Sequence, residues 1–281
     1  GDMCAAIDVP EGCTLTISGE GSLKATGGVG AGIGASSMRK GSLGTIEING
    51  GNIEAYGSGM AAGIGGGLEG GIGTIVINGG TVYAKGGHGS YPKDIKNVYG
   101  GAGIGGGAYG CVDRIEINGG NVTACGGYVT NAGRHPGAAI GTGGGGAKPV
   151  EDGYKYGEIV IKGGTVSAIA YNNEVYAIGI GVKPGQALQE GTLEGSISIS
   201  NKATVNLNGG DYFPKSENSG LKNYTIQGTI ADVRFIESTY PVTISVGEIT
   251  WDAGTMQVSD YQGTLKASNY LKPLTSGTPV T

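Results

Sequence analysis

The chain has little charge and no long apolar segment. Charged residues make up 15% of its 281 residues, and the formal net charge is −5. No basic stripe of the kind that binds phosphate backbones is present, so we exclude nucleic acid as a partner. No run of about 18 apolar residues occurs, so we predict no membrane span. The opening Gly1-Asp2-Met3 lacks the basic and apolar regions of a signal peptide, so we expect a processed or trimmed form.

Residues that hold metals or phosphates are also scarce. The chain has two histidines and four cysteines, and no Cys-x-x-Cys motif that would indicate zinc. Its glycine runs lack the aspartate of calcium-binding repeats and the Gly-Lys-Ser/Thr ending of phosphate loops. Acidic residues outside the repeats are scattered over several segments. We therefore predict no metal, no cofactor and no identifiable catalytic residue, although the sequence leaves open whether two carboxylates converge.

What the chain has instead is glycine, 62 residues of it, arranged with a period. The phrase Ile-x-Ile-Asn-Gly-Gly occurs at 46–51, 75–80 and 115–120, with a variant at 159–164. A second short segment follows each phrase, and then a third segment of the form Ala-Gly-Ile-Gly. The segments keep their lengths while the connections between them vary, which is typical of a solenoid with loop insertions.

Alternation along each segment assigns the core. Side chains of a strand switch faces at every residue, so the isoleucines of the first segment share one face. In the second segment an alanine recurs at one inward position, which indicates a narrow closed coil; these residues are Ala25, Ala55, Ala84, Ala124 and Ala168. The Asn-Gly-Gly corner needs a residue with positive φ, which glycine and asparagine tolerate best. We predict that Asn49, Asn78 and Asn118 stack as a ladder.

These features predict an all-β fold, a right-handed parallel β-helix with three strands per coil, about five to six coils and a C-terminal β cap. We assign residues 1–210 to the coil, with 1–13 as an N-terminal cap, and 211–281 to a cap of strands that is not an independent domain. Cys111 and Cys125 then lie at different corners, too far apart for a disulfide, whereas Cys4 and Cys13 could pair.

The phrase Gly-Ala-Gly-Ile-Gly-Gly-Gly at 101–107, together with Ile-Asn-Gly-Gly-x-Val-x-Ala, resembles glycine-rich repeat proteins of bacterial cell surfaces. The resemblance covers residues 14–182. Some relatives are carbohydrate-binding right-handed β-helices of pectate-lyase-like shape. The resemblance therefore implies an extracellular or cell-surface location and a glycan ligand. It is specific for the coil and weak for function, because the matching residues are core and corners.

Two long insertions, Gly86–Gly100 and Gly126–Gly137, leave the same corner in adjacent coils and hold both histidines of the chain. Function usually resides in loops of this size on a rigid scaffold. The chain also has 15 tyrosines, whose rings stack on sugars while their hydroxyls bind polar groups. We predict a glycan-binding surface on these loops, formed by His88, Tyr91, Asp94, Tyr99, Tyr128, Arg134 and His135.

Two other functions remain open at this stage. One is a polysaccharide lyase or glycoside hydrolase, which would need converging acids. The other is a structural or adhesive surface protein. The outward positions of the third segment are nearly devoid of side chains, at Gly32, Gly63, Gly103, Ala139 and Gly179. Such a strip could admit a ligand, a loop or a second copy of the chain.

Overall fold

The structure is a computed structural model that describes residues 3–37, 44–89, 99–128, 135–145, 154–170, 175–181, 193–200, 202–208, 239–246 and 249–257. Contacts divide the chain into two units, residues 1–234 and 235–281. The described residues of the first unit form a right-handed parallel β-helix of three six-stranded sheets, which confirms the predicted fold class. Among the described residues there is no helix that could cross a membrane.

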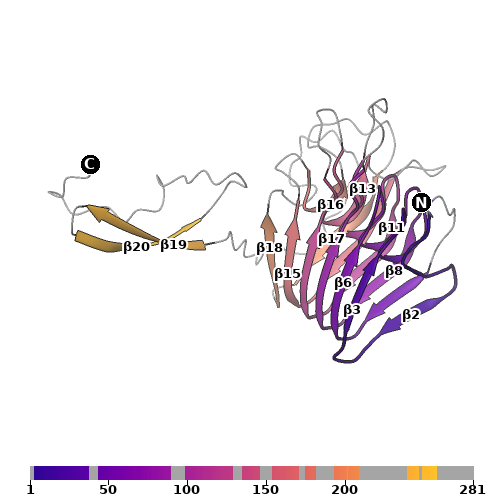
Figure 1. The fold of residues 1–281 in the computed structure, drawn as a ribbon, viewed down its shortest axis with the longest axis horizontal. Helices are drawn as coiled ribbons and strands as arrows, with labels where there is room; N and C mark the ends of the chain where they lie inside the picture. Colours follow the sequence, from indigo (N-terminus) through magenta and orange to yellow (C-terminus); the bar gives the residue numbers. More distant parts are fainter. Residues whose placement is uncertain are drawn as a thin grey trace. The chain divides into compact units, whose positions relative to one another are not determined.

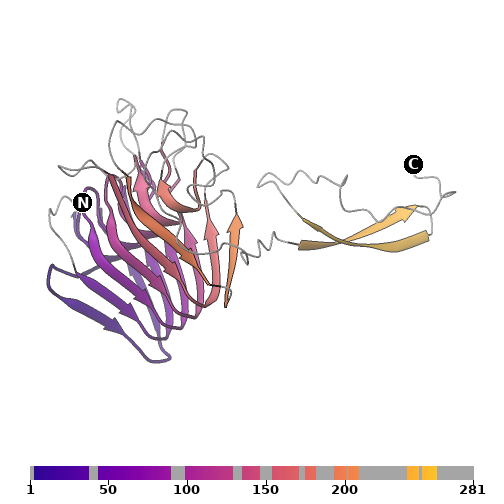
Figure 2. The same cartoon turned by 180° about the vertical axis from the view of Figure 1, so that it is seen from behind.

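Each sheet contains one strand from every coil (Figure 1, and Figure 2 from behind). The strands of each sheet are named below in spatial order, so that strands named next to each other are hydrogen-bonded. The first sheet contains β2 (Thr14–Ile17), β5 (Thr45–Ile48), β8 (Ile72–Ile77), β11 (Val112–Ile117), β14 (Tyr154–Ile161) and β17 (Leu193–Ile199). The second sheet contains β3 (Ser22–Thr26), β6 (Asn52–Tyr56), β9 (Thr81–Lys85), β12 (Asn121–Cys125), β15 (Gly164–Ile169) and β18 (Ala203–Asn208). The third sheet contains β1 (Ile7–Asp8), β4 (Ile33–Gly34), β7 (Ile64–Gly65), β10 (Ile104–Gly105), β13 (Ile140–Gly144) and β16 (Ile178–Gly181).

The core consists of columns of identical side chains that run along the coil. In the second sheet Ala84 pairs with Ala55 on one side and Ala124 on the other, so the predicted alanine column is confirmed. Ala84 and Ala124 are fully buried. The isoleucines of the Ile-x-Ile phrase of β5, β8, β11 and β14 in the first sheet, and those of β4, β7, β10, β13 and β16 in the third, are also fully buried. In these coils the core is closed, so a larger residue at the alanine position would overpack it. The column ends in β18 with Leu207, which is only partly buried.

The third sheet is the narrowest part of the coil, and glycine makes it possible. The glycine that follows the first isoleucine of each strand from β4 to β16 has positive φ, +138° at Gly34 and +136° at Gly105. A Cβ on Gly34 would lie 2.0 Å from the carbonyl oxygen of Gly65, and one on Gly105 would lie 1.8 Å from that of Gly141. No other residue type fits such spacing, so the Ala-Gly-Ile-Gly phrase is a packing requirement.

The asparagine ladder is also confirmed. Asn78 Nδ2 donates to Asn49 Oδ1 at 2.6 Å, and Asn118 Nδ2 donates to Asn78 Oδ1 at 2.7 Å. The positive φ of the corner, however, belongs to the second glycine and not to the asparagine; it is +87° at Gly80 and +90° at Gly120. The asparagines therefore contribute side-chain hydrogen bonds between coils, and glycine alone makes the turn.

The glycine strip of the third segment is not an exposed surface. Gly32, Gly63 and Gly103 are buried. A Cβ on Gly63 would lie 2.5 Å from the backbone nitrogen of Lys85, and one on Gly103 would lie 2.7 Å from that of Cys125. The ends of the second-sheet strands cover the strip because the coil is so narrow. Self-association stays a prediction, without this surface to support it.

The outer face of the first sheet carries an ionic network centred on Glu116. Its side chain is 14% exposed and pairs with both Arg114 and Lys162, while Arg114 also binds Glu158. Hydrogen bonds from Lys162 and Arg114 lower the pKa of Glu116 from 4.5 to about 2. The network joins Arg114 and Glu116 on β11 to Glu158 on β14 and to Lys162, which directly follows β14.

The two ends of the chain differ in part from expectation. Residues 7–8 of the predicted N-terminal cap form β1, the first strand of the third sheet. Beyond the coil, β19 (Thr239–Val246) and β20 (Ile249–Gln257) form an antiparallel hairpin in the second unit, and its expected role as a cap stays a prediction. In the described part of the chain no disulfide joins Cys111 to Cys125, or Cys4 to Cys13.

We predict that Ala84→Leu lowers the stability of the coil by about 1–3 kcal/mol or more, because the added atoms would overpack a closed column. Thr81→Leu is the matched control, since Thr81 lies on the same strand but faces solvent. Thermal unfolding measures both. Equal melting temperatures for the two variants would contradict the assignment of the core.

We also predict that the ionic network makes stability depend on pH. The pKa of Glu116 in the folded protein is about 2, which is lower than its ordinary value of 4.5. The Glu116 carboxylate therefore stabilises the fold above about pH 4.5, and this stabilisation is lost as the pH falls toward 2. Glu116→Gln should therefore melt at a lower temperature at pH 7, and the gap to the parent should close in acid. Lys162→Met should reproduce part of the effect. A gap that is constant from pH 7 to pH 3 would exclude this role.

Candidate functional site

The two insertions leave the second sheet after β9 and β12 and return to the third sheet at β10 and β13. Glycines at their bases form one continuous series of backbone hydrogen bonds. Gly101 N donates to Gly87 O at 3.1 Å, Gly127 N to Gly101 O at 2.8 Å, and Gly137 N to Gly127 O at 3.1 Å. The series alternates between the start and the end of each insertion. The insertions therefore begin side by side, as predicted, on a fixed backbone.

Each insertion has an aromatic residue just inside its start and another just inside its end. Because β9 and β12 pair in register, His88 and Tyr128 are equivalent positions, and their rings stack with centroids 4.3 Å apart. Tyr99 and His135 form a parallel β-bridge, and their rings stack at 5.2 Å. We call these four residues the aromatic frame. It consists of two His–Tyr stacks, one at each side of the loop bases.

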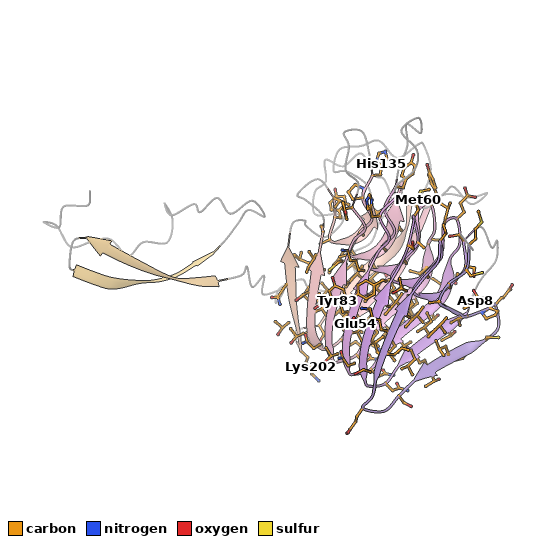
Figure 3. The ribbon with its side chains drawn as sticks, in the orientation of Figure 1. Asp8, Glu54, Met60, Tyr83, His135 and Lys202 are labelled. Atoms are coloured by element: carbon orange, nitrogen blue, oxygen red, sulfur yellow. The ribbon has the colours of Figure 1, made fainter. Side chains whose placement is uncertain are left out.

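Tyr99 is the buried member of the frame. It is 9% exposed and packs in a small apolar cluster with Met60 and Ala108. Its ring also contacts Tyr109, with centroids 4.5 Å apart. Figure 3 shows Met60 and His135 in the same region of the molecule. The face of the Tyr99 ring is thus occupied by protein, so this residue positions the frame and His135 rather than offering a surface of its own.

The other described members of the frame remain partly exposed: His88, Tyr128 and His135. The Nδ1 atom of His88 is buried and has no hydrogen-bond partner among the described residues. Because buried polar atoms in proteins are nearly always hydrogen-bonded, we expect a ligand or a water molecule to be the partner of this nitrogen. Three further residues of the predicted site, Tyr91, Asp94 and Arg134, lie outside the described residues, so the structure brings together four of the seven.

Tyr109 belongs to this site and was missed at the sequence level. It lies in the turn between β10 and β11 with a positive φ of +58°, which is uncommon for a residue other than glycine. Burial and a hydrogen bond with Tyr99 raise the pKa of Tyr109 above its ordinary value. The sequence did contain a sign that Tyr109 has a special role, because this large residue interrupts a glycine-rich phrase at a corner of the coil. Only the fold shows that this corner lies against the end of the first insertion.

Two carboxylates do converge in the structure, but away from the insertions. Glu116 and Glu158 both bind Arg114 on the first sheet. Hydrolysis of a glycosidic bond needs one carboxylic acid with a raised pKa, whereas the pKa of Glu116 is lowered. This pair therefore suits an ionic network better than catalysis. The described residues contain no group of three or more acidic, histidine or cysteine side chains that could hold a metal ion.

Comparison with known protein families gives one match. The family described as a beta helix repeat matches residues 15–37, 46–68 and 115–144, each of which begins in a first-sheet strand. No curated protein and no solved structure matches the chain. The family match and the three parallel sheets together establish a parallel β-helix built from repeats.

Proposed function

We propose that this protein is a secreted or cell-surface module that binds a glycan at the aromatic frame. The observation that carries the proposal is the pair of His–Tyr stacks at the bases of two adjacent insertions. Aromatic rings supply the apolar face on which a sugar ring packs, and imidazole and phenol groups bind its hydroxyls. The frame combines both kinds of group within one small region.

The scaffold supports this proposal by holding the rings in place before a ligand binds. His88 and Tyr128 each follow a glycine of the hydrogen-bonded series, so their backbone positions are fixed by the coil. Binding to rings that are already ordered costs less conformational entropy than binding to mobile side chains. Tyr109 packs against the buried ring of Tyr99, which in turn stacks on His135 and holds it in place.

We predict that Tyr128→Ala weakens glycan binding by about 1 kcal/mol or more, because it removes one exposed ring of the frame. The melting temperature should change little, since Tyr128 is only half-buried. A glycan array identifies the ligand, and titration with the selected oligosaccharide at millimolar concentration measures affinity. Tyr128→Phe keeps the ring and should bind more tightly than the alanine variant.

Two results would contradict the proposal. One is an absence of binding by the parent to every plant and host polysaccharide tested. The other is an affinity of Tyr128→Ala equal to that of the parent.

Tyr99→Ala provides a contrast with Tyr128→Ala. Because Tyr99 is buried among Met60, Ala108 and Tyr109, its removal leaves a cavity and should cost about 3 kcal/mol of stability. We therefore expect a lower melting temperature for Tyr99→Ala than for Tyr128→Ala. If the two variants melt alike, Tyr99 does not support the frame as described.

A further inference from the structure

A second aromatic surface lies on the outer face of the second sheet, on strands β6 and β9 before the chain enters the insertions. Tyr56 on β6 and Tyr83 on β9 are half-buried, and their ring centroids lie 5.7 Å apart at an interplanar angle of 49°. Figure 3 shows Tyr83 close to Glu54, its partner in the register of β6 and β9. Neither tyrosine belongs to the aromatic frame.

Both tyrosines of this face are held by neighbouring side chains. The hydroxyl of Tyr56 donates to Glu54 Oε2 at 3.1 Å, and the thiol of Cys125 donates to the hydroxyl of Tyr83 at 3.7 Å. Lys24 pairs with Glu54 at 3.6 Å and lies 5.3 Å from the centre of the Tyr56 ring. The rings are therefore ordered, and the carboxylate beside them is neutralised by a lysine.

Beside the tyrosines runs a column of uncharged polar side chains. The first outward position of the second-sheet strands is in register from coil to coil, and its residues are exposed from β3 to β15; they are Ser22, Asn52, Thr81, Asn121 and Thr165. Neighbouring strands lie ~4.8 Å apart, so the column offers hydroxyl and amide groups at a regular repeat along the coil. Such groups bind the hydroxyls of a sugar as donors or acceptors.

We infer that the outer face of the second sheet, from β3 to β12, binds an extended neutral glycan chain that lies along the axis of the coil. The tyrosine rings stack against the apolar faces of the sugars, and the side chains of the polar column form hydrogen bonds with the sugar hydroxyls. A neutral ligand fits the column because the column itself is uncharged, and beside it Glu54 is paired with Lys24. Lys85, at the end of β9, is the other charged residue at the outward positions of these strands. The net charge of −5 for the whole chain further disfavours a polyanion.

The face is a different surface from the aromatic frame, so the two can be tested separately. The chain itself provides the matched substitutions. Thr26 pairs with Tyr56, and Thr123 pairs with Tyr83, so threonine fits both outward positions of this sheet. The variant Tyr56→Thr/Tyr83→Thr therefore removes both rings with little risk to folding, and thermal unfolding checks this.

Affinity electrophoresis of the full chain tests the inference, with hydroxyethylcellulose and glucomannan as neutral probes and polygalacturonate as the anionic probe. We expect the neutral probes to retard the parent, and the double threonine variant to bind them about tenfold more weakly. Tyr56→Phe/Tyr83→Phe keeps the rings and should bind more tightly than the threonine variant. Tyr128→Ala, run alongside, reports on the aromatic frame.

The possible outcomes separate the two proposals. Unchanged retardation of the double threonine variant overturns the inference, and so does stronger retardation by polygalacturonate than by the neutral probes. If Tyr128→Ala loses retardation and the double threonine variant does not, the result supports glycan binding at the aromatic frame and overturns binding at the second sheet. If no probe retards the parent, both proposals fail for these glycans. A parent that sediments as a dimer, which the threonine variant converts to a monomer, shows a protein interface and also overturns the inference.

Discussion

The close approach of glycine backbones in the third sheet is the constraint on which the rest of the structure depends. At Gly34, Gly65 and Gly105 a Cβ would lie 2.0 Å or less from a carbonyl oxygen of the next coil. The positive φ of these residues excludes other side chains for a second reason. Because this sheet is so narrow, one inward position of the second sheet holds alanine from β3 to β15, and only in the last strand, β18, does Leu207 stand in this column. The same narrowness buries the glycine strip against the ends of the second-sheet strands.

A narrow coil with fixed register also determines how functional side chains are arranged. Equivalent residues of successive coils lie next to one another, so one position in the repeat becomes a column on the surface. The asparagine ladder is the simplest case, in which each side chain donates to the one before it. The stacks of His88 on Tyr128 and of Tyr99 on His135 follow the same rule, although they lie in insertions outside the repeat.

The three outer surfaces differ in chemistry although they share this scaffold. The first sheet has an ionic network in which Glu116 is held as a carboxylate by Lys162 and Arg114. The second sheet has tyrosines, a column of uncharged polar residues and one Lys24–Glu54 ion pair, and the loop bases have histidine with tyrosine. Paired ions suit stability of the sheet at neutral pH, because each charge has its partner within the protein. Ordered rings beside uncharged polar groups suit recognition of a hydroxylated ligand instead.

The sequence by itself determined the coil, because period, alternation and the alanine column depend only on local geometry that repeats. It also placed the two insertions at one corner, since their flanking strands are equivalent. Only the tertiary structure decided what the aromatic residues do. Tyr99 and Tyr128 look alike in the sequence, yet Tyr99 is buried and Tyr128 is partly exposed. Tyr109 reaches Tyr99 from the next corner of the repeat, on the other side of β10, and Tyr56 meets Tyr83 across neighbouring strands. Burial and ring contacts depend on which segments meet in space, and composition and spacing do not specify such contacts between side chains.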